Sequence, residues 1–469
     1  MKLLKNIFGL RCHFLLITHF LFWSAISKSQ PELVLGDKQY GNDECVQFSS
    51  DGLSIYTNYF NSIKTWNINT GKVETFITNE GLGYYIKFCP NKKIALSENH
   101  GIVKIWNIES GKLMYSLNGI DADFSPDGKW IFTIQEGPIE NYIGPLPLEE
   151  YEEGISFNET TTGILIHRWK IKSKYSICNA SISEDSKYLR VFSYTTLQVW
   201  DIVNESMISS LKYEKNFGCG NVDISPDGEW MIINGWDTQS FHWGRGISTL
   251  WRLSTGSIYN SLIKKILWRQ CSAGESPWKS SFSHDGKHFS LGIDCSKVGI
   301  WDSATGRLLY TLNTGDIYYQ PKPAIFSPDG KWIATTREYW MIESRDSTKI
   351  WDMKTGRLVW DIKGIFAGFH PYLPVVLVYD NSKYSLVSLE NGKTILSWMY
   401  MDSEDWVVIH PSGLFDASPG AMEKLYFIQD DEIIELESLK DKYYEPGLWE
   451  KVMSGEPLRA IENCILSFF

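Results

Sequence analysis

Short runs in which apolar and polar residues alternate, each ending in a tight turn, recur along most of this chain. The run at 122–128 reads ADFSPDG, and related runs occur at 222–228 (VDISPDG) and 324–330 (AIFSPDG). Alternation with a period of two is typical of a β-strand with one buried face. Proline presets φ for a turn, aspartate hydrogen-bonds nearby backbone, and glycine accepts a positive φ. Each run therefore predicts a strand that ends in a reverse turn. Weaker copies lie at 46–52, 86–92, 180–186, 280–286 and 367–373.

A second run alternates with the first and carries a tryptophan. Examples are VKIWNIESGK at 103–112 and TKIWDMKTGR at 348–357. Each predicts a strand that closes on a Thr-Gly, Ser-Gly or Asn-Gly hairpin turn. Asn158 and Val387 stand at this position in two weaker copies, and the position recurs every 36 to 52 residues. The tryptophans at this structural repeat position are Trp66, Trp106, Trp200, Trp251, Trp301 and Trp351.

One repeat thus predicts four short strands, and a single four-stranded sheet cannot bury both of its faces. Sheets stacked radially cover one another. The alternation of SPDG and WD…TG runs over residues 31–400 resembles the WD-repeat β-propeller family. The resemblance implies an all-β propeller of eight four-stranded blades; seven would also fit, because the third and eighth repeats are weak. The chain departs from the family in lacking its Gly-His pairs, and only Trp200, Trp301 and Trp351 precede aspartate.

Residues 401–469 follow a different pattern. After a strand and turn at 405–416, apolar spacing predicts a helix at 434–444, and a second helix is predicted at 446–453, with Gly455 ending it. This linker-like segment resembles the one that joins a WD-repeat propeller to a caspase-like peptidase in certain bacterial proteins. The resemblance implies the propeller half of such a system, with the peptidase domain missing, divergent or encoded separately.

The first residues have the order of a secretory signal peptide. Lys2, Lys5 and Arg11 precede an apolar stretch at 14–26, and small residues follow it. This order predicts a signal peptide at 1–29, cleaved on export to the periplasm or the extracellular space. An uncleaved anchor is the alternative, but the apolar stretch is short for a span of ~20 residues. No later stretch is long and apolar enough to span a membrane, so none is expected in the mature chain.

Composition narrows the class of partner. The chain has 469 residues and a formal net charge of −11, and no basic run interrupts it. Phosphate binding requires a basic surface, so nucleic acid is excluded as the main partner. Beyond the leader the cysteines are scattered without a C-x-x-C pair, which predicts buried side chains and not a disulfide framework.

Motifs for catalysis are absent or misplaced. Cys271 lies in RQCSAGES, one place too early for a caspase-like nucleophile loop, and His242 is 29 residues upstream. A Cys–His dyad needs both groups on a defined scaffold, whereas these two fall in predicted inter-strand loops. Histidines are dispersed, and no metal-ligand, phosphate-loop or nucleophile-elbow spacing occurs. The sequence therefore predicts no enzyme, no metal and no cofactor.

Long insertions between the predicted strands form the candidate binding surface. The two kinds of tight turn lie on one face of a propeller, and the long segments 135–154, 235–247, 266–279, 315–323 and 337–347 fall on the other. They are rich in Trp, Tyr and Arg, the residues enriched at binding hot spots. We expect this loop-rich face to bind a protein or peptide; caps on the blades and a sugar-binding surface are the alternatives. The sequence does not indicate an oligomeric state. The candidate binding residues are Tyr142, Trp236, Trp243, Arg245, Trp268, Trp278, Tyr319, Arg337 and Trp340.

Overall fold

A computed structural model gives the fold as two compact units. The larger unit is Tyr40–Ile395, and the smaller combines Met1–Gln39 with Leu396–Phe469. The predicted signal peptide at 1–29 lies outside the described residues. These are residues 32–35, 46–59, 62–77, 85–91, 93–135, 151–173, 177–183, 186–193, 196–212, 217–237, 246–252, 257–258, 280–294, 296–315, 323–337, 346–380, 383–401, 405–430 and 432–460.

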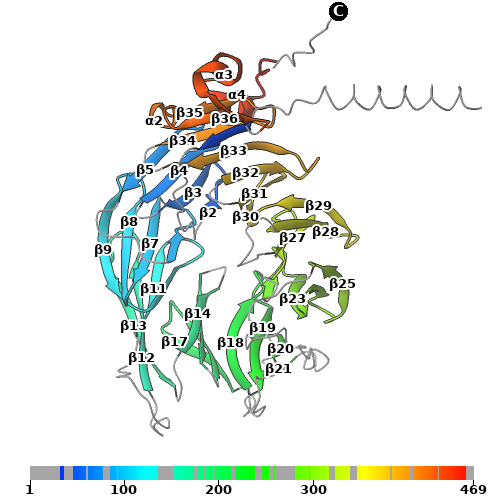
Figure 1. Ribbon diagram of the computed structural model, residues 1–469. Helices are drawn as coiled ribbons and strands as arrows, with labels where there is room; N and C mark the ends of the chain where they lie inside the picture. Colours follow the sequence, from blue (N-terminus) through cyan, green and yellow to red (C-terminus); the bar gives the residue numbers. More distant parts are fainter. Residues whose placement is uncertain are drawn as a thin grey trace, which may run out of the picture. The chain divides into compact units, whose positions relative to one another are not determined.

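The larger unit consists of four-stranded antiparallel sheets whose strands follow chain order, here called blades 1 to 8 (Figure 1). Blade 1 contains β2 (Val46–Phe48), β3 (Ser54–Tyr59), β4 (Ser62–Asn67) and β5 (Val73–Ile77). Blade 2 contains β6 (Tyr85–Phe88), β7 (Ile94–Asn99), β8 (Ile102–Asn107) and β9 (Lys112–Asn118). Blade 3 contains β10 (Asp121–Phe124), β11 (Trp130–Gln135), β12 (Tyr151–Glu159) and β13 (Leu165–Ser173). Blade 4 contains β14 (Ile177–Ile182), β15 (Tyr188–Ser193), β16 (Thr196–Asp201) and β17 (Ser206–Lys212).

The second half of the unit repeats this arrangement. Blade 5 contains β18 (Phe217–Ile224), β19 (Trp230–Asp237), β20 (Gly246–Arg252) and β21 (Ser257–Ile258). Blade 6 contains β22 (Ser280–Phe282), β23 (His288–Asp294), β24 (Lys297–Asp302) and β25 (Leu308–Asn313). Blade 7 contains β26 (Ile325–Phe326), β27 (Trp332–Arg337), β28 (Ser347–Asp352) and β29 (Leu358–Lys363). Blade 8 contains β30 (Ile365–Phe369), β31 (Val375–Asp380), β32 (Lys383–Ser388) and β33 (Thr394–Tyr400), which leads into the smaller unit.

Eight blades confirm the predicted all-β propeller and decide against seven. Burial explains the stacking. The second strands are buried along most of their length, as in β11 and β15, whereas the fourth strands β9 and β29 have exposed positions throughout. Apolar clusters join one blade to the next; one of them combines Ile105 of blade 2 with Phe124 of blade 3. Each sheet therefore covers a face of its neighbour.

The ring closes through side chains of the first and last blades. β2 of blade 1 contacts β30 of blade 8 (Figure 1). His370 Nε2 donates to the carbonyl oxygen of Gly52 at 3.0 Å, and its Nδ1 accepts from the backbone N–H of Leu373 at 2.9 Å. The His370 ring also meets the Phe48 ring edge-on at 5.0 Å. Burial lowers the pKa of His370, so the neutral imidazole holds this closure.

The smaller unit combines the N-terminal strand with the C-terminal residues. β1 (Glu32–Leu35) pairs with β36 (Leu425–Gln429), which pairs with β37 (Glu432–Glu435). β34 (Trp406–Ile409) and β35 (Phe415–Ala417) form a hairpin. An apolar core gathers Leu33, Val407, Phe415, Phe427 and Tyr443 from these elements and the helices. The helices are α2 (Pro419–Met422), α3 (Leu436–Tyr443) and α4 (Leu448–Ser454).

The helices differ slightly from the sequence prediction. The helix expected at 434–444 starts at Leu436, because Ile434 belongs to β37 and the chain turns at Asp430, whose φ is 53°. The helix expected at 446–453 is α4, and Gly455 ends it with a φ of 74°. No helix within the described residues is long and apolar enough to cross a membrane.

Candidate binding surfaces

The turns after the first strands are built by one repeated hydrogen-bond pattern. Ser125 Oγ donates to Asp127 Oδ1 at 2.6 Å and accepts from the N–H of Trp130 at 2.9 Å. Burial alone would raise the pKa of Asp127, but hydrogen bonds from Ser125 and Lys129 and the Lys129 charge hold it below its usual value. The same pattern surrounds Asp329. These aspartates are therefore engaged within their own turns.

Turns of neighbouring blades also bond to one another. Asn91 Nδ2 in blade 2 donates to the Asp127 carbonyl in blade 3 at 2.9 Å, and the N–H of Asp127 donates to Ser186 Oγ in blade 4 at 3.2 Å. In blade 1, the Ser50 carbonyl accepts from the Tyr372 hydroxyl of blade 8 at 3.1 Å. The face that carries these turns, here called the turn face, thus uses its polar groups to hold the blades together.

A second contact between blades recurs at the turns before the fourth strands. The Tyr115 hydroxyl of blade 2 donates to the Thr160 carbonyl of blade 3 at 2.6 Å. Tyr310 does the same to Lys354 between blades 6 and 7, at 2.5 Å, and Trp360 Nε1 donates to the Leu389 carbonyl between blades 7 and 8, at 3.0 Å. Each aromatic ring lies against the glycine of the next blade's turn. We call this contact the aromatic seam.

Blades 3 and 4 place a histidine and a glutamate at the seam. His167 Nδ1 lies 3.1 Å from Glu205 Oε1. Glu205 occupies the place of the turn glycine and keeps its left-handed backbone, with φ at 53°. Beside this contact, large apolar side chains are exposed on both blades. They are Ile164, Leu165 and Ile166 in blade 3 and Val203, Met207 and Ile208 in blade 4.

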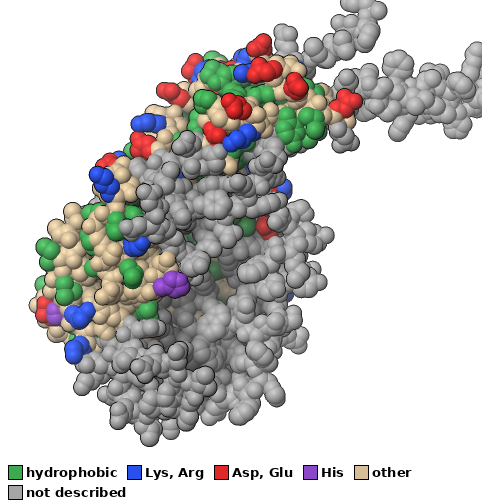
Figure 2. Space-filling model, turned by 60° about the vertical axis from the view of Figure 1, so that its left-hand side comes forward, with side chains coloured by type: hydrophobic (Ala, Val, Ile, Leu, Met, Phe, Trp, Pro, Cys, Tyr) green, Lys and Arg blue, Asp and Glu red, His purple; other side chains and the backbone are tan. Residues whose placement is uncertain are grey.

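These side chains stand out against the other repeats. Ile164 follows the turn glycine at a position where blades 1 and 2 carry Lys72 and Lys112, and Val203 stands where blade 2 carries Glu109. Val203 is 78% exposed and Ile164 61% exposed. Apolar side chains also show on the described surface in Figure 2. This outer edge of blades 3 and 4 is therefore less polar than the same place in other blades.

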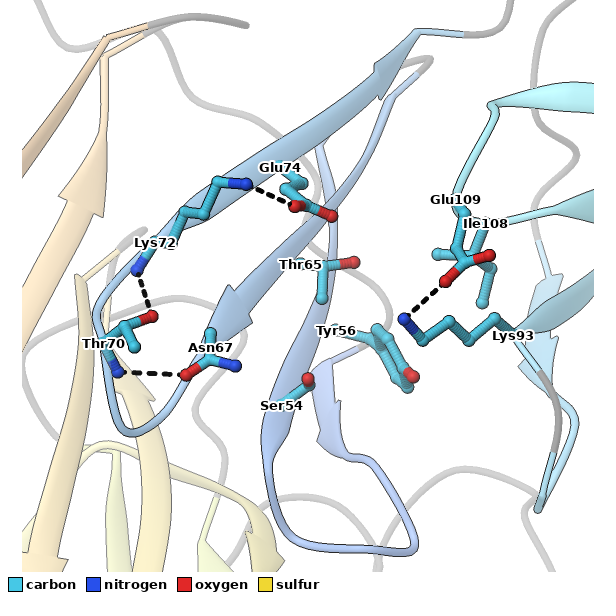
Figure 3. Close-up of a pocket in the computed structure, with 10 residues that line it drawn as sticks. All are labelled: Ser54, Tyr56, Thr65, Asn67, Thr70, Lys72, Glu74, Lys93, Ile108 and Glu109. Atoms are coloured by element: carbon cyan, nitrogen blue, oxygen red, sulfur yellow. Dashed lines mark hydrogen bonds and ion pairs between the residues drawn. The ribbon is translucent and has the colours of Figure 1, made fainter.

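Between blades 1 and 2 none of the described side chains forms the aromatic seam, and a cavity of about 150 Å³ lies there (Figure 3). Blade 1 contributes one wall and blade 2 the other. The lining residues are Ser54, Tyr56, Thr65, Asn67, Thr70, Lys72, Glu74, Lys93, Ile108 and Glu109.

An ion pair stands on each wall of this cavity. Lys72 Nζ lies 2.9 Å from Glu74 Oε1 on blade 1, and Lys93 Nζ lies 2.6 Å from Glu109 Oε1 on blade 2 (Figure 3). The hydrogen bond that Lys93 donates to Glu109 raises the pKa of Lys93, so this lysine stays charged. Burial, with smaller effects of nearby acids, raises the pKa of Tyr56 to about 12, so its hydroxyl stays protonated.

A buried polar network lies between blades 5 and 6. Ser248 Oγ donates to Asn234 Oδ1 at 2.6 Å, and Asn234 Nδ2 donates to Ser280 Oγ at 3.0 Å. Burial raises the pKa of Asp223, which is hydrogen-bonded to Ser280, to about 7, even though the N–H of Ile224 also bonds to it. This carboxyl is thus close to half-protonated at neutral pH.

The predicted loop-face residues fall almost wholly outside the described side chains. Trp236 lies in β19, opposite Gly218 and Gly246, so its backbone belongs to a strand and not to the predicted loop. Arg337 likewise ends β27, opposite Ser347. The side chains of both are outside the described set. The whole residues outside it are Tyr142, Trp243, Arg245, Trp268, Trp278, Tyr319 and Trp340.

The repeated tryptophans occupy equivalent places on the third strands. Trp106 Nε1 donates to Ser97 Oγ and Trp351 Nε1 to Thr335 Oγ1, both at 2.9 Å. Trp200 donates to Gln198 at 3.2 Å and Trp251 to Thr249 at 2.9 Å, whereas Trp66 and Trp301 occupy the same register in β4 and β24. The acceptor of the indole N–H is thus a hydroxyl or amide on the second or third strand.

The catalytic candidates named from the sequence, Cys271 and His242, lie outside the described residues. Cys89 is buried, and its thiol donates to the Gly128 carbonyl at 3.7 Å. Among the described residues, no three His, Cys, Asp or Glu side chains gather as metal ligands would.

Sequence reasoning missed the cavity between blades 1 and 2. A signal was present in the repeat itself: Thr65 precedes Trp66, whereas Ile105, Ile300 and Ile350 precede the corresponding tryptophans. A polar residue at a position that is apolar in the other repeats marks a place where the blade-to-blade contact changes.

Comparison with known proteins supports the repeat assignment. No protein-family profile matches the chain. It is 19% identical to the human angio-associated migratory cell protein over 289 residues, 58% of this chain and 58% of that relative. It is 32% identical to the small ribosomal subunit protein RACK1z of Oryza sativa subsp. japonica over 81 residues, 17% of this chain and 21% of that relative. The chain thus spans less than two thirds of either relative.

A solved structure with a similar fold supports the propeller. The computationally designed Ika8 protein is similar, with a TM-score of 0.51 and 16% identity, over 79% of this chain and 100% of that one. The two sequence relatives are WD-repeat proteins. With the eight stacked sheets, these similarities support a WD-repeat β-propeller.

Proposed function

We propose that this chain is an exported, non-enzymatic scaffold that binds a protein or peptide through its loop-rich face. A WD-repeat propeller is a rigid ring whose function resides in the segments that connect its strands. The observation that supports the proposal most strongly is the hydrogen bonding of the turn face. The polar groups of the turn face form hydrogen bonds within a blade and between neighbouring blades.

Strand order gives the end of each blade that the long segments leave from. In an antiparallel four-stranded blade, the first-to-second and third-to-fourth connections leave one end, and the remaining connections leave the opposite end. The long segments 136–150, 238–245, 259–279, 316–322 and 338–345 all belong to the second kind. Trp, Tyr and Arg in these segments are suited to anchor a partner.

The experiment is a pull-down of the mature protein followed by titration of variants against the captured partner. We expect Trp340→Ala or Trp243→Ala to weaken binding at least tenfold, because an anchor typically contributes ~2 kcal/mol or more. Lys129→Ala and Lys331→Ala are matched controls on the turn face, where both lysines are exposed and pair with their own turn aspartates. Circular dichroism confirms folding.

Val203→Ser tests the exposed edge of blades 3 and 4. If this change removes binding and the tryptophan changes do not, the partner docks at that edge and the proposal for the loop-rich face is wrong. Sequencing of the native protein tests export: the first residue should fall between about Ala25 and Glu32. Intact Met1 in a soluble cytoplasmic fraction contradicts export.

A regulatory half of a caspase-like peptidase system is the second candidate. It is favoured by how the residues of the resembling segment pack in the smaller unit. The N–H of Gly447 donates to Asp416 Oδ2 at 2.8 Å, and the Phe415 and Tyr444 rings lie 5.6 Å apart. Glu445 pairs with Arg459 at 2.9 Å. The YYEPGL and FDAS runs thus form one folded surface. A captured partner with a peptidase domain would support this candidate.

A further inference from the structure

The cavity between blades 1 and 2 arises from a difference in strand register. In blades 2, 6 and 7 a β-bulge precedes the repeated tryptophan, and the residue before the tryptophan pairs with the seam aromatic. Ile105 thus faces Tyr115 in blade 2. Blade 1 has no such bulge, and Thr65 pairs with Glu74. A short polar pair therefore stands where the other blades place an isoleucine and a large ring.

The space left by the missing ring is lined by groups that suit a ligand. Tyr56 and Ile108 provide apolar surface, with the Tyr56 ring stacked on Phe88 at 4.5 Å. Thr65 Oγ1 is buried and has no hydrogen-bond partner among the residues that the structure describes. Buried polar atoms are nearly always satisfied, by protein groups, water or a ligand, so this hydroxyl needs an explanation.

The charges of the cavity balance. Lys72 and Glu74 stand on one wall, and Lys93 and Glu109 on the other, with side chains 48% to 72% exposed at the rim. The charge of Glu74 reaches Lys93 across the seam, which places the two walls within electrostatic range of each other. A simple anion would be repelled by two carboxylates and a simple cation by two ammonium groups. A ligand with both charges meets an opposite charge for each.

We propose that this cavity binds a small α-amino acid as its zwitterion. The carboxylate lies toward Lys72 and Lys93, and the ammonium toward Glu74 and Glu109. The Thr65 hydroxyl completes the polar contacts, and a short side chain rests on Tyr56 and Ile108. A cavity of about 150 Å³ limits the ligand to a few heavy atoms, since a water molecule takes ~30 Å³ of liquid volume.

Calorimetric titration with glycine, alanine and serine tests the proposal, with acetate and methylammonium as probes that carry only one of the two charges. We expect at least one amino acid to bind at least tenfold more tightly than either single-charge probe. Thr65→Ile restores the residue of the other repeats and fills the space, so binding should fall at least tenfold without loss of folding.

Lys72→Met and Lys112→Met form a matched pair. Both lysines follow the turn glycine of their blade, but Lys112 stands beside the Tyr115 seam, away from the cavity. We expect Lys72→Met to weaken amino-acid binding and Lys112→Met to leave it unchanged. If no amino acid binds more tightly than acetate, or if Thr65→Ile leaves binding intact, the cavity is a hydrated gap and the proposal is wrong.

Discussion

The seam between blades 2 and 3 and the seam between blades 1 and 2 are built from the same repeat and reach opposite results. In the first, the Tyr115 ring covers Gly163 and its hydroxyl holds the Thr160 carbonyl. In the second, Glu74 takes the place of the ring, and a polar cavity remains. A repeat can therefore keep its four strands while the contact between two blades changes. A shift of one residue in the strand pairing is enough, because it turns the side chains to the other face.

A third contact, between blades 5 and 6, contains the buried Asp223. A substitution there should have the largest effect on stability. The pKa of Asp223 is about 7 in the fold, above the ordinary value of 3.8. The folded chain therefore binds more protons than the unfolded chain between about pH 4 and 7, and stability falls as pH rises through this window, by about 1.4 kcal/mol per pH unit. Asp223→Asn should remove this loss, so urea unfolding should show the variant more stable than the wild type at pH 7 by about 4 kcal/mol.

At pH 4 the two proteins should differ little, because the wild-type carboxyl is then protonated in the fold. If wild type and Asp223→Asn were equally stable at pH 7 as well as at pH 4, burial of Asp223 would not disfavour its charge.

Removing an aromatic seam should come next in size. Trp360→Ala deletes a partly buried indole that packs on Gly392 and bonds to the Leu389 carbonyl. We expect a loss of about 3 kcal/mol of unfolding free energy, at the lower end for tryptophan because the side chain is not fully buried. Leu358→Ala in the same strand is the control, since Leu358 is 45% exposed and should change stability little. Equal losses for the two variants would mean that the seam contributes no more than the surface.

A glycine pair isolates the ring contact from backbone strain. Gly163 and Gly101 both have positive φ, at 73° and 77°. A Cβ on Gly163 would meet the Tyr115 ring at 2.7 Å, whereas one on Gly101 meets nothing within 4 Å. Gly163→Ala should therefore cost about 2 kcal/mol and Gly101→Ala about 1 kcal/mol, measured by thermal unfolding. A larger effect at Gly101 would contradict close packing at the seam.

Filling the open seam should give the smallest effect and the opposite sign. Thr65→Ile replaces a buried hydroxyl that has no partner with the residue found in blades 2, 6 and 7. We expect a gain of about 1 kcal/mol, from added apolar burial and the lost desolvation cost. Ile105→Thr is the reciprocal change and should destabilise blade 2. A destabilising Thr65→Ile would show that the hydroxyl is satisfied in solution.

The repeat made most of the fold predictable. Turn residues such as Pro126 and Gly128 mark the end of a strand, and the tryptophan position marks the third strand, so strand number and order followed from spacing. The cavity could not be predicted in the same way, because a β-bulge beside Trp106 and its absence beside Trp66 leave no trace in period-two alternation.

Elements outside the repeat were harder to place. Ile434 fits helical spacing, but pairing with Phe427 draws it into β37. The partner of Glu32–Leu35 lies almost four hundred residues along the chain, beyond the range of any local pattern. The loop-face residues remain a prediction.

The way the ring closes bears on how such a molecule could have arisen. Each blade is made of consecutive strands, and blades 1 and 8 meet through His370, Tyr372 and Gly52 without exchanging a strand. Contacts therefore join strands of the same blade or of neighbouring blades, and each added unit needs only its neighbours. Duplication or loss of a whole repeat would change the circumference of the ring without rethreading it, and the two end blades would need only a few side chains to fit again.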